Sequence, residues 1–224
     1  HELRTPLTLI MAPLESLIKG DLGLVPEAQQ HHAEIMYQNS LRLLKLINNL
    51  LDLAKIDAGR MELDLSSIDL SVFIKGIVAS ISPMADKKKI LLSFANGAHL
   101  PKVACDKDKI EKVMLNLIFN SLKFTEPGGK VTVSCGRDNG QVFVKVTDTG
   151  IGIPAEKLES IFENFQQASS GTSRLYGGTG LGLAIVKKLV EAQHGAISVK
   201  SKVEVGSEFV FILSFPKTHL KPKQ

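Results

Sequence analysis

The chain has 224 residues, and its 27 lysine and arginine residues against 23 aspartates and glutamates leave a net charge of +4. This length accommodates one or two domains, and a content of 44% hydrophobic and 22% charged residues excludes a wholly disordered chain or a collagen-like fibre. No apolar run approaches the roughly 18 residues that a membrane-spanning helix requires. The charge is too small and too evenly spread to predict a nucleic-acid partner.

The chain begins at His1 without an initiator methionine, and nothing at its start resembles a signal peptide. We therefore expect it to be a piece of a longer protein. Its two cysteines, Cys105 and Cys135, lie far apart and lack metal-ligand spacing. We expect both to be buried apolar residues in a reducing compartment.

The first 60 residues are rich in leucine and follow a helical period. Apolar residues from Leu3 to Leu17 recur in steps of four and three, which is the spacing of a helix-bundle seam, and that spacing returns between Met36 and Ala54. A break at 20–26 separates the two segments. The pattern predicts an all-α antiparallel helical hairpin whose apolar face is too wide for one partner to cover, and hence a dimeric four-helix bundle.

The pattern becomes mixed after Gly59. We expect strands at 63–65, 90–95, 131–135 and 142–146, helices at 73–84, 106–124 and 179–193, a loop at 168–178, and two last strands on either side of Gly206. The hairpin at Asp138-Asn139-Gly140 is a strong signal, because Asn-Gly accepts the positive φ angles of a tight turn. These elements predict a separate α/β layer in which helices cover one face of a sheet.

Three polar residues share one stripe of the predicted helix at 106–124. Asn116, Asn120 and Lys123 fall within about 60° of one another, beside the apolar face. One interpretation is an ordinary solvated helix face. Asparagine is a mediocre helix former, however, and surface stripes usually favour Glu and Lys, so a binding role is the alternative.

Residues 148–154 read DTGIGIP and follow the end of a well-patterned strand. A carboxylate at Asp148 can accept a hydrogen bond from an exocyclic amine, and Gly150 and Gly152 would let the backbone approach a flat ring closely. The alternative is a strand-terminating turn in which Pro154 starts a helix.

Residues 177–183 read GGTGLGL and lie at the start of the predicted helix at 179–193. Backbone N–H groups at a helix N-terminus bind phosphate, because they are unpaired and the helix dipole is favourable there. The run lacks the preceding strand of a dinucleotide fingerprint and the Lys-Ser/Thr of a P-loop. Alone, this run is weak evidence for phosphate binding, but the presence of the other two motifs in the same chain strengthens it.

These three motifs, in this order, resemble the N, G1 and G2 boxes of the sensor histidine kinases. Residues 161–165, IFENF, look like the intervening F box, and residues 1–8, HELRTPLT, match the phosphoacceptor H box. The resemblance covers essentially the whole chain. It implies an α/β sandwich of the type shared by histidine kinases, topoisomerases and chaperone ATPases, the Bergerat fold, after the helical hairpin.

The resemblance implies roles for the first residues of the chain. His1 would be phosphorylated, which suits an imidazole whose neutral nitrogen is nucleophilic at pH 7. Glu2 would orient the ring and accept its proton. Thr5 would position water to dephosphorylate a partner, and Pro6 would kink the helix. Because the chain begins on His1, we expect this piece to bind ATP well and to autophosphorylate poorly.

The resemblance also implies a nucleotide site. Asn120 would be the Mg²⁺ ligand, and Asp148 would read the adenine amino group. Phe124 would lie against the adenine or ribose, or equally belong to the core. The further residues implied to contact the nucleotide are Asn116, Lys123, Gly150, Gly152, Ile153, Gly178, Thr179, Gly180, Leu181, Gly182 and Ser207, with 166–178 as a lid.

One position separates the kinases from their relatives. The topoisomerase and chaperone ATPases carry a glutamate, the base that activates water, where this chain has Asn116. Without that base the resemblance implies transfer of the phosphoryl group to His1 in place of hydrolysis.

The function expected is that of a sensor histidine kinase core, which uses ATP and Mg²⁺ to phosphorylate His1 and passes the group to an aspartate of a response-regulator receiver domain. We expect a dimerisation and phosphotransfer domain at 1–60, an ATP-binding domain at 61–219 and a tail at 220–224. The core would be a cytoplasmic homodimer within a sensor anchored in the inner or plasma membrane. The alternatives are a non-catalytic nucleotide-binding scaffold and a member that acts mainly as a phosphatase of its regulator.

Overall fold

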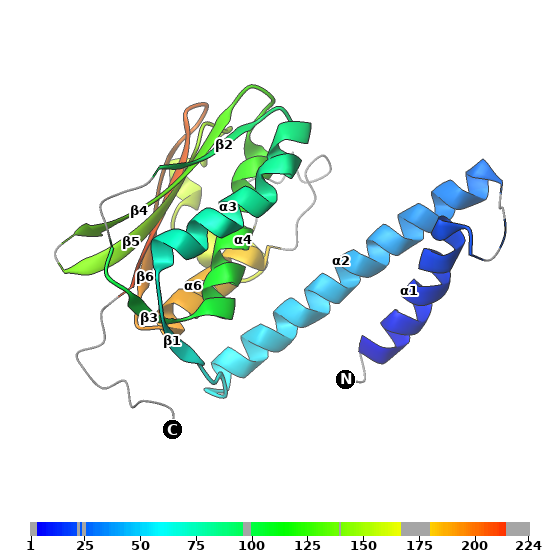
Figure 1. The fold of residues 1–224 in the computed structure, drawn as a ribbon, viewed down its shortest axis with the longest axis horizontal. Coiled ribbons are helices and arrows are strands. Elements are labelled where there is room, and N and C mark those ends of the chain that lie inside the picture. Colours follow the sequence, from blue (N-terminus) through cyan, green and yellow to red (C-terminus); the bar gives the residue numbers. More distant parts are fainter. Residues whose placement is uncertain are drawn as a thin grey trace. The chain divides into compact units, whose positions relative to one another are not determined.

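The computed structural model describes residues 4–21, 23, 26–95, 100–138, 140–166 and 180–213, with the backbone alone for Arg4. The chain divides into two compact units, His1–Arg60 and Met61–Gln224. The first is helical and the second is a sheet with helices on it (Figure 1), so the predicted fold class is confirmed. Within the described ranges, no helix has the length and apolar character needed to cross a membrane.

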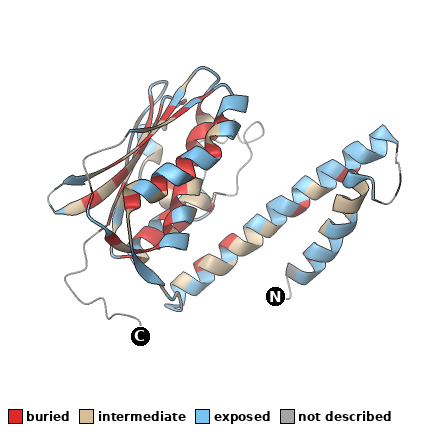
Figure 2. Cartoon of the chain, viewed as in Figure 1, coloured by how far each residue is buried: buried red, intermediate tan, exposed pale blue. Residues whose placement is uncertain are grey.

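The first unit is a hairpin of α1 (Arg4–Lys19) and α2 (Glu27–Asp57), which run antiparallel and pack against each other (Figure 1). Leu7, Ala33 and Leu53 are buried in it. Figure 2 shows that much of both helices stays exposed, and part of the predicted seam is among the exposed residues, namely Ile10, Met36, Leu43 and Leu50. A single hairpin therefore leaves apolar side chains uncovered.

Two prolines lie in α1. Pro6 lies near the described start of α1, and because residues 1–3 lie outside the described residues, the kink expected at Pro6 stays a prediction. Pro13 lies inside the helix, where the missing N–H interrupts the ladder of backbone hydrogen bonds.

The second unit is built on a five-stranded sheet with the order β2-β4-β5-β7-β6. Its strands are β2 (Leu91–Ala95), β4 (Lys130–Asp138), β5 (Gln141–Asp148), β6 (Ala196–Lys202) and β7 (Gly206–Leu213). Neighbours are antiparallel except β2 and β4, and a separate antiparallel pair joins β1 (Leu65–Ile68) to β3 (Val103–Asp106). Asp138 pairs with Gln141, which confirms the predicted hairpin, and Gly140 has the expected positive φ of 80°.

Among the described residues, three helices cover one face of this sheet (Figure 1): α3 (Leu70–Lys87), α4 (Lys107–Phe124) and α6 (Gly182–Ala192). Two short 3₁₀ turns, η1 (Ala155–Lys157) and η2 (Ser160–Phe162), follow β5. The core lies between the helices and the sheet, where every second residue of β5 is buried. Cys105 and Cys135 are buried and free, as predicted, and burial raises the pKa of the Cys105 thiol to about 12.

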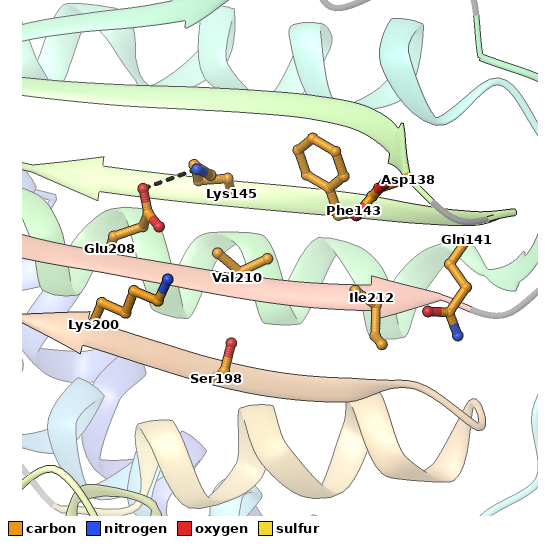
Figure 3. Close-up of a pocket in the computed structure, with 9 residues that line it drawn as sticks. All are labelled: Asp138, Gln141, Phe143, Lys145, Ser198, Lys200, Glu208, Val210 and Ile212. Carbon is orange, nitrogen blue, oxygen red and sulfur yellow. Dashed lines mark ion pairs between the residues drawn. The ribbon is translucent and has the colours of Figure 1, made fainter.

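The opposite face of the five-stranded sheet carries an open hollow of about 400 Å³ (Figure 3). Phe143 and Val210 line it, and Lys145 Nζ lies 2.9 Å from Glu208 Oε2 there. Because side chains alternate along a strand, Lys145 and Asp148 of β5 point to opposite faces. The hollow is therefore separate from the motifs at 148–154 and on α4.

Three element predictions need correction. The strand β3 was missed, because its four residues run directly into a helix cap. The expected strand at 63–65 lies at Leu65–Ile68. The helix expected from 179 begins at Gly182, because Gly180 has a φ of 69°, which an α-helix excludes. Most of the expected loop at 168–178 and the expected lid at 166–178 lies outside the described residues.

Asp106 joins three segments of the second unit. Its Oδ1 caps α4 by accepting a hydrogen bond from Lys109 N–H at 3.1 Å, and its Oδ2 accepts one from Asp64 N–H at 3.0 Å. Its own N–H donates to Gln193 Oε1, at the end of α6, at 2.8 Å. The side chains of Asp106 and Gln193 are both buried. Asp106 thus holds the starts of β1 and α4 together and ties them to the end of α6.

We expect Asp106→Ala to lower the free energy of unfolding by about 2–3 kcal/mol, because it removes a helix cap and leaves buried N–H groups without an acceptor. Asp69 offers a matched control, since its carboxylate caps α3 through Val72 N–H at an exposed position. Asp69→Ala is expected to cost about 1 kcal/mol. Urea unfolding followed by circular dichroism measures both, and equal losses would contradict the role given to Asp106.

Candidate functional site

The candidate site lies on the helix-covered face of the sheet, where the end of β5 meets α4 and the start of α6. Asp148 is the last residue of β5, and the stripe of Asn116, Asn120 and Lys123 lies on α4. The structure therefore brings the first two predicted motifs, and the described part of the third, to adjoining elements.

The Asp148 carboxylate is the most constrained group of the site. Its Oδ1 accepts hydrogen bonds from Gly150 N–H at 3.0 Å and from Ser207 N–H at 3.2 Å, and its Oδ2 accepts one from the Ser121 hydroxyl at 3.0 Å. The residue is 6% exposed. Burial raises the pKa of this carboxyl, while the three hydrogen bonds act in the opposite direction. An ionised carboxylate has about four acceptor positions, so one is left, on Oδ2.

The glycines after Asp148 are required by the packing of the protein itself. A Cβ at Gly150 would collide with the carbonyl oxygen of Phe124, and one at Gly152, whose φ is 71°, would collide with the carbonyl of Lys202. Gly206 has the same relation to the carbonyl of Asp148. Gly150 and Gly152 are predicted to admit a flat ligand, but the close contacts that they make in the structure are with other backbone segments.

The polar stripe of α4 is partly exposed. Asn116 Nδ2 donates to Lys112 O at 2.8 Å, and Asn116 Oδ1 faces Gly182, where it would lie 3.1 Å from an added Cβ. Its amide oxygen thus points to the start of α6. Lys123 Nζ lies 4.6 Å from the centre of the Phe124 ring, and Phe124 is neither fully buried nor fully exposed.

The Gly-rich motif is described from Gly180 onward, and Gly178 and Thr179 lie outside the described residues. Phe165 N–H donates to Gly180 O at 3.0 Å, and Leu181 is fully buried. The helix α6 begins directly afterwards, and its first N–H groups have no intrahelical partner. These groups suit phosphate oxygens.

Ser207 was expected to face a nucleotide, but its hydroxyl lies 3.0 Å from Ser201 Oγ. Ser201 in turn donates to Gly206 O and accepts from Ile153 N–H, both at 2.8 Å. Ile153 is therefore held in place by a serine of β6. Ser207 contributes to the site through its backbone N–H to Asp148.

Two residues of this network, Ser121 and Ser201, are not among the predicted site residues. Ser121 had a visible signal, because it is a hydroxyl residue among the buried apolar positions of α4, which include Leu117, Ile118 and Leu122. Ser201 had no such signal, since the contact that joins it to the turn after β5 is with Ile153, 48 positions away in sequence. His1 and Glu2 lie outside the described residues, and Thr5 is exposed on α1.

The chain matches two family models. The model of the His Kinase A (phospho-acceptor) domain matches residues 1–59, and the model of the histidine kinase-, DNA gyrase B-, and HSP90-like ATPase matches residues 105–218. The range that the second model matches therefore includes Asn116, Asp148 and Gly182.

Known proteins are similar over nearly all of the chain. It is 35% identical to the circadian input-output histidine kinase CikA of Synechococcus elongatus, over 93% of the chain and 28% of that protein. It is 38% identical to the sensor histidine kinase TmoS of Ectopseudomonas mendocina, over 93% of the chain and 21% of that protein. The crystal structure of full-length ShkA in complex with AMPPNP has a TM-score of 0.83 and 32% identity, over 96% of the chain and 44% of ShkA. The chain thus spans about a quarter of the length of these two curated relatives.

Asp148→Asn tests the carboxylate without removing its shape. We expect ADP binding, measured by isothermal titration calorimetry, to weaken at least about tenfold, because the amide would present a donor where the carboxylate presents an acceptor. The free energy of unfolding should stay equal or rise at pH 7, since the raised pKa means that burying the ionised form costs stability. That gain should disappear below the ordinary pKa of aspartate, where the carboxyl is protonated in both states. Undiminished ADP binding would contradict the role of Asp148.

Proposed function

We propose that this chain, which belongs to the histidine kinase family, binds ATP and transfers the γ-phosphoryl group to His1. The single observation that carries this proposal is the presence of a phospho-acceptor domain, whose matched range starts at His1, and an ATPase-type site around Asp148 in one chain. In the transfer, the bond between the γ-phosphorus and the bridging oxygen breaks, a bond from phosphorus to an imidazole nitrogen forms, and ADP leaves. Glu2 accepts the imidazole proton.

The donor set on α4 fits a magnesium ion that is held largely by nucleotide phosphates. Asn120 offers one partly exposed amide oxygen, and no group of three His, Cys, Asp or Glu side chains within the described ranges could hold a metal. Mg²⁺ commonly keeps waters and phosphate oxygens and takes few protein ligands. Bound there, the ion would neutralise charge that develops on the phosphates, with Lys123 nearby on the same stripe.

Asn116 favours transfer to a side chain over hydrolysis. Its amide cannot take a proton from water, and its Nδ2 is already bonded to the Lys112 carbonyl. The amide oxygen of Asn116 faces Gly182 at the start of α6. The role of Asn116 is therefore to position polar groups near the phosphates. Water is then a poor competitor for the γ-phosphoryl group.

The later steps involve other chains. We propose that the phosphoryl group passes from His1 to an aspartate of a response-regulator receiver domain, and that two copies of the hairpin form a four-helix bundle. The exposed apolar residues Ile10, Met36, Leu43 and Leu50 support the dimer. The core would work in the cytoplasm, where ATP is supplied, within a longer sensor anchored in the inner or plasma membrane.

His1→Gln tests the transfer. With γ-labelled ATP and Mg²⁺, the wild-type chain, or a form extended before His1, should acquire label that acid removes and base does not. His1→Gln should acquire none and should bind ADP as wild type does. Asn120→Ala serves as the complementary control, which should lose labelling because Mg²⁺-ATP is misplaced and should keep the dimer. Label that survives His1→Gln would exclude this assignment, and ADP binding without any labelling of the extended form would favour a non-catalytic scaffold.

Thr5 supports a second activity, the dephosphorylation of the partner regulator. It is exposed on α1, three residues after Glu2, where its hydroxyl could hold a water for attack on an aspartyl phosphate. We expect Thr5→Ala to slow the loss of label from a phosphorylated receiver domain by about tenfold or more. Thr8→Ala, a second exposed threonine of α1, is the matched control and should leave that rate unchanged. Equal rates for Thr5→Ala and wild type would exclude the role.

A further inference from the structure

Ser121 occupies an unusual position on α4. It is 2% exposed, and its neighbours on the buried face of the helix are apolar. A buried serine in a helix commonly donates to the carbonyl four residues earlier. The Ser121 hydroxyl donates instead across to β5, to Asp148 Oδ2 at 3.0 Å.

The acceptor positions of Asp148 are nearly all used within the protein. The Gly150 and Ser207 N–H groups occupy both positions on Oδ1, and Ser121 occupies one position on Oδ2. The position left on Oδ2 is the one that a ligand donor can take. Both donors on Oδ1 are backbone N–H groups. Among the described contacts of this carboxylate, the donor that comes from a side chain is the Ser121 hydroxyl.

We propose that Ser121 is a positioning and specificity-determining residue, whose hydroxyl holds Asp148 as an acceptor with a single open position and so makes the site select purines with a 6-amino group. This inference rests on the proposed nucleotide-binding function. Without the hydroxyl, Oδ2 would have two open positions in a nearly dry site, and a water or a proton would take one of them. The amino group of the base would then meet a less well ordered acceptor.

The inference separates recognition of the amino group from general integrity of the site. A purine that lacks the 6-substituent makes the same ring, ribose and phosphate contacts but gives no hydrogen to Asp148. Loss of the Ser121 hydroxyl should therefore weaken binding of the amino-bearing nucleotide and have little effect on the other. A residue that only supports the fold would weaken both by the same factor.

The experiment measures binding of ADP and of purine riboside 5′-diphosphate to the whole chain by isothermal titration calorimetry. Diphosphates are used because they cannot transfer a γ-phosphoryl group. The variants are Ser121→Ala and Ser121→Cys, the second of which fills nearly the same space with a weak donor. Ser80→Ala is the control, because Ser80 on α3 donates only locally, to Ile77 O at 2.7 Å. Thermal unfolding verifies that each variant is folded.

Wild type and Ser80→Ala should prefer ADP by about tenfold, the value of one hydrogen bond to a charged acceptor. Both Ser121 variants should reduce this preference to about twofold, and in an Asp148→Asn background Ser121→Ala should change it no further. An unchanged preference in the Ser121 variants, or an equal loss for both nucleotides, would overturn the inference while the proposed function stands. Failure of wild type to bind either nucleotide would overturn the proposed function and the inference together.

Discussion

The second unit is organised around one buried carboxylate. Asp148 receives hydrogen bonds from α4 through Ser121, from the turn after β5 through Gly150, and from β7 through Ser207. A buried charge is costly unless its acceptor positions are filled, so these three segments are held in one arrangement whenever the carboxylate is ionised. The same constraint leaves one acceptor position for a ligand. Stability and recognition thus depend on the same atoms.

The backbone around this carboxylate is packed too closely to admit side chains. The carbonyl of Phe124 accepts from Ile151 N–H at 3.1 Å and lies where a Cβ on Gly150 would be, and the carbonyl of Asp148 has the same relation to Gly206. The turn that follows β5 therefore rests on the end of α4 and on the start of β7. Glycine at these positions lets three backbone segments meet within hydrogen-bonding distance of one side chain.

A second polar contact of the same kind lies at the other end of α4. Asp106 caps that helix and binds Asp64 N–H, while its own N–H reaches Gln193 at the end of α6. Asn116 Oδ1 faces Gly182 at the start of α6, and the two helices pack against each other. The groups proposed to hold phosphate therefore lie on two helices that pack against each other.

Much of this architecture follows from local chemistry that the sequence displays directly. The apolar spacing in the first 60 residues determines the helices there, and the alternation of apolar residues determines β4 and β5. The Asn-Gly pair determines the turn between these strands. None of these elements needs distant residues, because hydrophobic period and turn geometry are local properties. The start of α6 was predicted three residues early, since Gly180 has a left-handed backbone and an added Cβ there would collide with Phe165, neither of which the local pattern displays. The order of the motifs identified the family. The nucleotide-binding roles of Asn116, Asn120 and Asp148 stay predictions, and Ser121 and Ser201 were not among the predicted residues. Only the tertiary structure decided which donors meet Asp148, because hydrogen bonds between residues 27 and 59 positions apart depend on how helices and strands pack.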